Sequence, residues 1–548
     1  MFMRSGRPAL TIALLAGAGA GASADLPLPA PEARTMDGWG NNLNDPTMGM
    51  AGATQLRDTD ARYADGVGAM MPGPDARVVS NAIGQQTITG NAAGLSAMFW
   101  QWGQFVDHDI VRTDAGGAFE PMFAPAGDPV FPAGAMIPFS RSAPGTDASG
   151  VNAYQNQITS FLDGSGVYGS DDTRAAALRS FEGGHLATDA DGFMTRNTAG
   201  MDNANDGFLP AETMFLAGDV RANEQAGLTA MHTVFVREHN LWADRLAAEN
   251  PTWDDEQIYQ GARKIVGAEI QSVTYNEWLP AMLGSDAMGD YAGYDSSVDA
   301  GISLEFSTAA FRFGHSMLNE TLARLNADGS AYAAGDLTLH ENFFNPDTIT
   351  GDGALDALLR GMSAQEAEEL DTQVAGGVRN MLFGDPGMGG MDLLAANIMR
   401  GRDHGIGSFN DIREAYGLDR LASWDELTSD TDLLTSLSML YSSVDDVDAW
   451  VGLVAEDHLD GSIAGETLSA VLIDQFSRLR DGDRFYYLND PALLGYLDEI
   501  DSTTLGDIFC RNTGITCFDG SVFYAVPAPG AGGVLALAGV FASRRRRR

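Results

Sequence analysis

Residues 103–110 read Gly-Gln-Phe-Val-Asp-His-Asp-Ile, and they are the most informative stretch of this chain. The stretch follows the aromatic run 99–102 and sets one histidine between two carboxylates. If it is helical, Gln104 and His108 lie one turn apart on the same face, and Asp107 lies beside them. An apolar wall that carries an amide, an imidazole and an acid suits a buried cofactor. Taken alone, a histidine flanked by aspartates is more often a solvated or salt-bridged detail, so other segments must decide.

The composition is that of a large and strongly acidic globular protein. The chain has 548 residues, of which 44% are hydrophobic and 9% aromatic, enough for a sizeable core. Its formal net charge is −42, and Lys264 is the only lysine. Such a surface repels nucleic acid and anionic membranes, so we exclude both as partners. Solubility in a salty environment explains the acidity, which therefore says little about the substrate.

Both ends of the chain carry patterns typical of targeting signals. Two arginines, an apolar run and a small-residue site predict a secretory signal peptide over residues 1–24, with the mature chain starting near Asp25. The tail 521–548 holds Val-Pro-Ala-Pro, an apolar stretch and five arginines. It resembles the PEP-CTERM sorting signals of Gram-negative bacteria, which implies an exported protein at the cell surface or outside the cell, touching the membrane only through this tail. The alternative is a weak C-terminal membrane anchor.

Cys510 and Cys517 are the only cysteines, and they lie close together in the chain. In an oxidising compartment this spacing predicts a disulfide that closes a small loop. A metal site would need more ligands of the soft type. We therefore expect a structural cross-link without a chemical role.

Helical periodicity dominates between the two ends. Apolar residues recur at three- and four-residue spacing in the stretches 228–247, 253–282, 354–382 and 433–453. Strand-like alternation is scarce, and long loops rich in Gly, Pro and Asp separate the helices. The sequence therefore predicts a mainly α fold with little β structure, formed by one large domain over residues 25–520.

A second imidazole stands in the aromatic segment 311–316, Phe-Arg-Phe-Gly-His-Ser. On a helix, His315 has Arg312 one turn earlier on the same side. Gly314 would let a flat group or another backbone approach closely, because it has no side chain. This segment is a candidate partner for the first histidine.

Three more segments are dense in polar groups. Asn397 and Arg400 place an amide and a guanidinium three residues apart, and Arg221 and Glu224 repeat the spacing with opposite charges. Residues 159–165, Thr-Ser-Phe-Leu-Asp-Gly-Ser, present oxygen atoms at every second residue. That alternation can wrap a hard cation such as calcium.

Taken in their order along the chain, these five segments resemble the animal-type haem peroxidases of the peroxidase–cyclooxygenase superfamily, in a bacterial form. The similarity runs from residues 34–43 to about Cys517, nearly the whole mature chain. Each motif alone is weak, but the ordered set is very specific. The resemblance implies a large single-domain haem peroxidase fold that binds haem b. It also implies a peroxidase that uses hydrogen peroxide, through a ferryl intermediate, to oxidise bromide, iodide, thiocyanate or phenolic donors.

The resemblance gives each polar group a role. His315 matches the proximal iron ligand, and Asn397 matches the amide that accepts its other N–H and so fixes the ring. His108 matches the distal base, which moves a proton between the two oxygens of the peroxide. Arg221 matches the distal cation that stabilises the charge developing as the O–O bond breaks. Gln104 matches the distal glutamine that holds water, or halide where halide is used.

Further groups match the residues around the haem edge. Arg312 and Arg400 stand like the arginines near the haem propionates. Asp107 and Glu224 match two carboxylates that are ester-linked to haem methyl groups in the mammalian members, which implies covalent or partly covalent haem. Gln225 stands where myeloperoxidase carries a sulfonium-forming methionine. That third link is not expected here, and efficient chloride oxidation is correspondingly not expected.

The resemblance also implies a calcium site. Asp109, next to the distal base, matches one ligand. The others are in the loop: Thr159, Phe161 through its carbonyl, Asp163 and Ser165. A cation bound there would tie the loop to the distal helix and hold the distal base in place.

The remaining histidines have simpler interpretations. His232 and His239 are seven residues apart, which is too far for one ion, and we interpret both as structural. His404 is expected in a packed ion-pair network. His185, His340 and His458 have no partner that the sequence identifies.

Two other functions can be compared with the peroxidase. The fatty-acid dioxygenases of the same superfamily use a tyrosine three residues before the proximal histidine, and Arg312 occupies that position here. A non-catalytic cell-surface matrix protein would have no need for His108, Arg221 and Gln104 in this arrangement. Both features favour the peroxidase.

Overall fold

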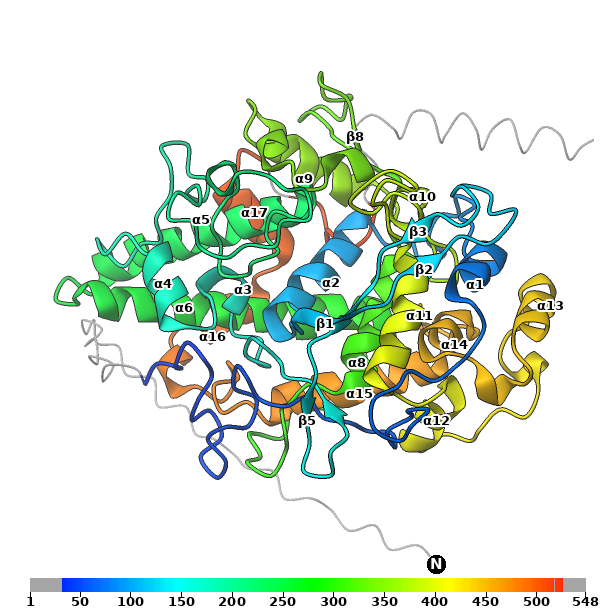
Figure 1. Cartoon of the computed structure of the whole chain (residues 1–548). Coiled ribbons are helices and arrows are strands. Elements are labelled where there is room, and N and C mark those ends of the chain that lie inside the picture. Colours follow the sequence, from blue (N-terminus) through cyan, green and yellow to red (C-terminus); the bar gives the residue numbers. More distant parts are fainter. Residues whose placement is uncertain (1–31, 517, 526–548) are drawn as a thin grey trace, which may run out of the picture.

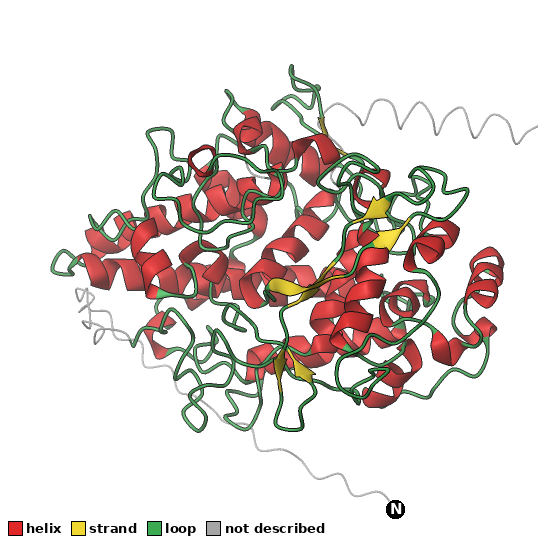
Figure 2. Cartoon of the chain, viewed as in Figure 1, coloured by secondary structure: helices red, strands yellow, loops and turns green. Residues whose placement is uncertain are grey.

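The computed structural model describes residues 32–516 and 518–525, and helices make up most of its regular structure (Figure 2). The helices are α1 Ala76–Ile83, α2 Ala97–Ile110, α3 Ser165–Tyr168, α4 Asp172–Leu178, α5 Ala226–Glu249, α6 Asp255–Ser272, α7 Leu279–Leu283, α8 Leu304–Thr308, α9 Ala354–Ala364, α10 Gly376–Arg379, α11 Leu393–His404, α12 Phe409–Ala415, α13 Thr431–Leu440, α14 Ala449–Ala455, α15 Glu466–Asp481, α16 Leu497–Ser502 and α17 Leu505–Asn512. The predicted mainly α fold is confirmed.

Strands are short and paired two by two within the described residues. The antiparallel pairs are β1 Ala115–Phe119 with β4 Ser140–Ser142, β2 Met122–Phe123 with β3 Met136–Ile137, β5 Gly145–Thr146 with β6 Asn152–Ala153, and β7 Thr321–Leu322 with β8 Leu337–Thr338. None of these pairs forms a layer of the fold. They brace the long loops that the sequence predicted.

Helix α2 runs through the middle of the molecule, with α5 and α9 among its neighbours (Figure 1). It begins at Ser96, whose hydroxyl accepts the Met98 N–H as an N-cap. Apolar residues occupy nearly every side of this helix, as expected for a helix enclosed by others. Phe99 stacks on Trp278 with ring centroids 5.2 Å apart, and the Trp278 indole N–H donates to the Phe99 carbonyl. Core packing thus fixes the helix that carries residues 103–110.

Two of the four predicted helical stretches are continuous. Residues 228–247 lie within α5, and 253–282 comprise α6, a π-helical turn at Val273–Trp278 and α7 without a break. A π-turn contains one residue more than an α-turn, so it rotates the residues after it around the helix axis. The turn ends on Trp278, the residue that meets α2.

The other two stretches are interrupted, so helical spacing there does not correspond to one unbroken helix. Residues 365–375 are not helical, and Glu366, Glu368 and Val374 form backbone bridges with residues 85–96 instead. Residues 441–448 separate α13 from α14, and Asp448 there accepts two hydrogen bonds from Arg402. Both interruptions come from long-range contacts that override the local periodicity.

Some predictions concern residues outside the described part of the chain. They are the signal peptide over 1–24, most of the tail 521–548, and Cys517 with its expected disulfide to Cys510. Among the residues that are described, no helix combines the length and the apolar character needed to cross a membrane.

Candidate active site

The distal side of the site is formed where α2 meets the turn that precedes α5. Gln104 Nε2 lies 3.4 Å from Glu224 Oε1, and Arg221 Nη1 lies 3.8 Å from Asp107 Oδ2. His108 is on the same helix as Gln104 and Asp107, one turn beyond the amide. The structure therefore brings together all five residues that the sequence predicted for this side.

Asp219 is a member of the distal side that the sequence analysis missed. Its carboxylate accepts two hydrogen bonds from the Arg221 guanidinium, at 2.9 Å from Nε and 2.8 Å from Nη2. Burial is the largest influence and opposes its ionisation, but the charge and hydrogen bonds of Arg221 and the nearby His108 together hold the pKa of Asp219 below its ordinary value. The signal available in the sequence was the Asp-Val-Arg spacing, which lets the acid fold back on the arginine.

His108 is buried and neutral. Burial, and after it the Arg221 cation, hold the pKa of His108 well below its ordinary value. His108 Nδ1 lies 3.6 Å from Asp219 Oδ1, which is too long for a hydrogen bond. The ring can therefore accept a proton, and the Asp219 carboxylate lies near enough to stabilise the resulting imidazolium.

Two other carboxyl groups of the distal side are shifted toward their neutral forms. Burial raises the pKa of Asp107 to about 6 and that of Glu224 to about 7, although the Arg221 cation opposes both shifts. Asp219, bound directly by Arg221, stays ionised. The Arg221 cation therefore keeps Asp219 ionised but does not overcome the effect of burial on the pKa of Asp107 and Glu224.

The proximal side is formed by the 3₁₀-helix η3, Ala310–His315, packed against α11. His315 Nδ1 lies 3.1 Å from Asn397 Oδ1, which can only accept, so the ring donates there and leaves Nε2 with its lone pair. Burial lowers the pKa of His315 to about 3, so the ring is neutral. With three residues per turn in η3, Arg312 lies directly beside His315. A neutral imidazole with its second nitrogen held by an amide is the donor that an iron porphyrin needs.

Residues that keep accessible surface lie on both sides. Every residue of α2 is buried except Gly103, Gln104 and Asp107, which share one face. On η3, a Cβ atom built on Gly314 would meet no atom within 4 Å, and His315 is only half-buried. Helix α2 contacts η3, and the Arg312 charge acts on Asp107, so these surfaces lie near one another. We call the space that they border the central cavity, and the open approach at Gly314 fits the expected haem.

Two arginines mark one edge of the central cavity. Burial, and after it the nearby Arg400 cation, lower the pKa of Arg312 to about 10. An anionic group between these two arginines would therefore stabilise the charge of both. Arg400 is also bound by Asp403 at 2.8 Å and by the Ser142 hydroxyl at 2.7 Å. These contacts fit an edge that receives haem propionates, with Arg312 the less neutralised cation.

The predicted calcium loop folds against α2. Gly164 and Gly166 donate their N–H groups to the two carboxylate oxygens of Asp109, at 3.1 and 2.9 Å. The Ser165 hydroxyl donates to the Asp109 carbonyl at 2.7 Å, and Thr159 donates to Asp163 at 3.1 Å. The four predicted ligand side chains therefore lie in one cluster.

Asp109 of α2 and Asp163 of the loop are buried close together. Burial, and after it the negative charge of Asp163, raise the pKa of Asp109 to about 7. Phe161 lies in the same loop with its ring fully buried. Within the described residues no group of three or more His, Cys, Asp or Glu side chains forms a metal cluster, so any cation here would depend on hydroxyl and carbonyl oxygens as well.

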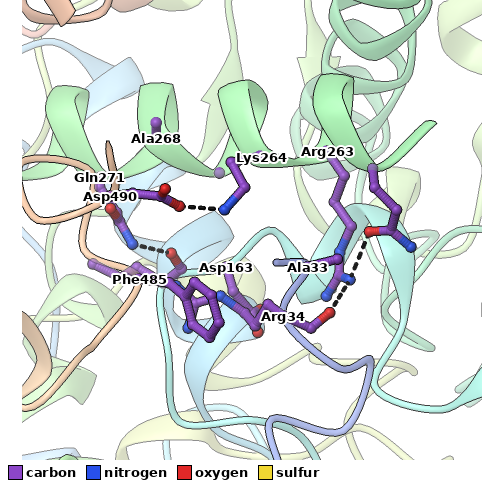
Figure 3. Close-up of a pocket in the computed structure, with 12 residues that line it drawn as sticks. Ala33, Arg34, Asp163, Arg263, Lys264, Ala268, Gln271, Phe485 and Asp490 are labelled. Atoms are coloured by element: carbon purple, nitrogen blue, oxygen red, sulfur yellow. Dashed lines mark hydrogen bonds and ion pairs between the residues drawn. The ribbon is translucent and has the colours of Figure 1, made fainter. Parts of the chain in front are cut away.

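A pocket opens on the outer side of the loop. Figure 3 shows Asp163 at its wall together with Arg34, Arg263 and Lys264. The Arg34 guanidinium donates to Asp483 at 2.8 Å and lies between two aromatic rings. Arg34 is paired with Asp483 and Lys264 with Asp490. Arg263 instead donates to the backbone carbonyls of Arg34 and Thr35. The pocket supports the loop from behind and holds none of the residues of the central cavity.

Three of the other histidines, His232, His239 and His404, pack in the protein interior. His239 contacts the Gly184 carbonyl at 2.8 Å and the Tyr168 hydroxyl at 3.0 Å. His232 is fully buried on the same helix, α5. His404 stacks on Tyr154 with ring centroids 3.8 Å apart.

Comparison with known proteins gives a consistent result. Residues 33–523 match the family model described as animal haem peroxidase. Peroxinectin A of Dictyostelium discoideum is 33% identical over 503 residues, which cover 88% of this chain and 93% of that protein. The mouse peroxidasin homolog is 36% identical over 566 residues, which cover 90% of this chain but only 38% of that longer protein.

Solved structures share the fold. Peroxidase A from Dictyostelium discoideum superimposes with a TM-score of 0.83 at 32% identity, over 91% of this chain and 99% of that one. The fatty acid alpha-dioxygenase of Arabidopsis thaliana gives a TM-score of 0.77 at 20% identity, over 91% of this chain and 84% of that one. The second likeness is one of fold alone.

Proposed function

Because this chain belongs to the animal haem peroxidase family and is therefore a peroxidase, we propose that its electron donors are small anions (bromide, iodide or thiocyanate) or phenols. The observation that carries the proposal is the pairing of two neutral imidazoles on opposite sides of the central cavity. His315 carries an amide on its second nitrogen, and His108 lies beside a guanidinium. One is suited to hold a metal, and the other is suited to move a proton.

The chemistry follows from what each side chain can do. When bound, haem b supplies an iron that reduces hydrogen peroxide and then oxidises the electron donor. His315 would hold that iron through Nε2, oriented by Asn397. His108 would take the proton from the peroxide oxygen that is retained and deliver it to the other, departing oxygen, so that water leaves. Arg221 stabilises the negative charge that develops on the departing oxygen.

Asp107 and Glu224 are proposed to bind haem methyl groups as esters, each new C–O bond replacing a methyl C–H bond in a two-electron oxidation for which hydrogen peroxide is the oxidant. Their raised pKa values support this, because a carboxyl group that is partly neutral in its site loses little charge stabilisation on esterification. Arg312 and Arg400 would receive the propionates. Gln225 in place of a methionine leaves two links at most.

Calcium is proposed between Asp109 of α2 and four loop residues, Thr159, Phe161, Asp163 and Ser165. Two buried carboxylates with hydroxyl and carbonyl oxygens between them suit a hard cation. Chelation should therefore lower peroxidase turnover, and added calcium should restore it. Equal turnover before and after exhaustive chelation would argue against the ion.

Export and a location at the cell surface of a Gram-negative bacterium complete the proposal. They depend on the signal peptide over 1–24, the peroxidase domain over 25–520 and the sorting tail over 521–548. The fatty-acid dioxygenase alternative is disfavoured by Arg312, since an arginine cannot form the phenoxyl radical that those enzymes require.

Reconstitution tests the proposed function directly. The mature chain, supplied with hemin and calcium, should show a Soret band and oxidise bromide, iodide, thiocyanate or a phenol when peroxide is added. His108→Ala should keep the Soret band and lose turnover by roughly a hundredfold or more, since general acid–base catalysis contributes about 10²–10⁴-fold. A wild-type chain without a Soret band, or a variant with unchanged turnover, would overturn the assignment.

A further inference from the structure

Helix α5 begins with an unusual cap. The N-cap residue is Gln225, whereas Ser, Thr, Asp and Asn are the residues preferred there. Gln225 Oε1 accepts the Gly227 N–H at 2.6 Å. A backbone N–H is always a donor, so this contact identifies which end of the Gln225 amide is oxygen.

The nitrogen end of the same amide reaches helix α2. Gln225 Nε2 donates to Gln101 Oε1 at 2.5 Å and to Gln104 Oε1 at 2.9 Å. Gln225 and Gln101 are buried, so no water competes for these groups. Since both N–H groups of Gln225 are used, Gln104 must turn its carbonyl toward Gln225.

The orientation of Gln104 determines what it presents to the central cavity. Its NH₂ group faces away from Gln225 and lies 3.4 Å from Glu224 Oε1. Across residues 32–516 and 518–525, Glu224 is the one acceptor of this NH₂ group, so the second N–H is left for a bound molecule. Gln104 keeps accessible surface on the face of α2 that borders the cavity.

The space around this cap is adapted to the amides. A Cβ atom at Gly227 would lie 2.4 Å from Gln101 Oε1 and 3.0 Å from Gln225 Oε1. Any larger residue there would displace both side chains. The glycine therefore gives the two amides the room that their contact needs.

We propose that Gln225 is a positioning residue that fixes the amide of Gln104 with its N–H toward the cavity. The site that binds the electron donor then selects a small anion, which accepts this hydrogen bond, in preference to a neutral phenol. The inference deepens the proposed function and rests on it. An anion gains more than a neutral molecule from an N–H donor, because charge-assisted hydrogen bonds are about twice as strong. Gln225 would thus set the specificity for the electron donor without touching the electron donor itself.

Two substitutions test this in the reconstituted holoenzyme. Gln225→Asn keeps a preferred cap for α5, but its amide is one methylene too short to reach both glutamines. Gln225→Glu keeps the acceptor for Gly227 and removes the NH₂ donor, so Gln104 must turn its own NH₂ toward the carboxylate and its carbonyl toward the cavity. Both variants should lower the ratio of kcat/KM for thiocyanate or iodide to kcat/KM for a phenol by about tenfold or more.

The loss should appear mainly in KM for the anion, and thiocyanate should shift the Soret band of the resting variants only at correspondingly higher concentration. Gln475→Glu is the matched control, because Gln475 is a fully buried amide whose hydrogen bonds to Gly301, Ser303 and Arg478 involve no residue of the cavity. It should leave the ratio unchanged. Equal ratios in wild type and both Gln225 variants would overturn the inference. A wild-type chain without a Soret band would instead contradict the proposed function.

Discussion

On the distal side of the central cavity His108 lies among charged groups, whereas on the proximal side His315 is held by one amide. Arg221 and Asp219 form a buried ion pair beside the first ring, and two further acids lie within reach of that arginine. The second ring has Asn397 as its partner, with Arg312 the nearest charge. The difference matches the tasks, since moving protons needs charges that respond to one another and holding a metal needs a fixed, neutral donor.

Replacing Arg221 should show the largest effect, because the distal side depends on its charge. Arg221→Gln should lower kcat/KM for peroxide by about 10²–10³-fold, the usual cost of losing one preorganised donor at a developing negative charge. The Soret band of the resting enzyme should change little. Stopped-flow reaction with peroxide measures the rate. A loss smaller than about threefold would contradict the role of Arg221.

A smaller loss is expected on the proximal side. Asn397→Ala removes the acceptor of the His315 N–H and should lower haem affinity or turnover by about 10–100-fold, as for other residues that orient a metal ligand. Unlike the distal change, it should shift the Soret band. Asn397→Asp keeps an oxygen acceptor and is expected to restore haem binding. If both variants bind haem like the wild type, the amide is not the support of the ring.

The ester on the distal side can be probed without measuring catalysis. Glu224→Gln removes the oxygen that would bind the haem methyl group, so acidified organic solvent should extract more haem from the variant than from the wild type. Mass spectrometry of the denatured wild type should show protein that retains haem mass. Identical extraction from both would mean that Glu224 forms no ester.

The smallest effect concerns a buried acid outside both sides of the cavity. Burial, and after it the charge of Glu238, raise the pKa of Glu269 well above its ordinary value. The folded state therefore binds a proton that the unfolded state releases, so the free energy of unfolding should fall as pH rises from about 4.5 upward through the folded-state pKa. Chemical denaturation at a series of pH values measures this.

Glu269→Gln is the control for that measurement, because a neutral amide has nothing to titrate. Its free energy of unfolding should depend less on pH than that of the wild type over the same interval. Parallel curves for the two proteins would show that Glu269 is already ionised. The peroxidase ratio of anion to phenol should be the same in both, since this acid lies outside the cavity.

The sequence predicted which residues form the two sides better than it predicted the contacts between them. Residues 103–110 carry their chemistry within one helix, so local periodicity was enough to place Gln104, Asp107 and His108 together. Asp219 was missed because its importance comes from folding back onto Arg221. Gln225 was interpreted only as a residue that replaces a methionine. Its contacts with α2 depend on how α2 and α5, which are far apart in the sequence, pack together.

The interrupted helices have a similar cause. The stretch 365–375 has helical periodicity, yet its backbone pairs with residues 85–96, which are far away in sequence. Local pattern cannot reveal such a pairing, because the competing hydrogen bonds come from another part of the chain. The same limit applies to every contact that joins α2 to the rest of the molecule.

The π-helical turn at Val273–Trp278 limits how this protein can vary in length. Deleting one residue there would restore regular α-helical bonding but rotate the subsequent residues by about 100° around the axis. Trp278 would then leave Phe99, and α2 would lose the neighbour on which it stacks. Insertions and deletions among natural variants should therefore accumulate in the long surface loops and avoid this six-residue segment.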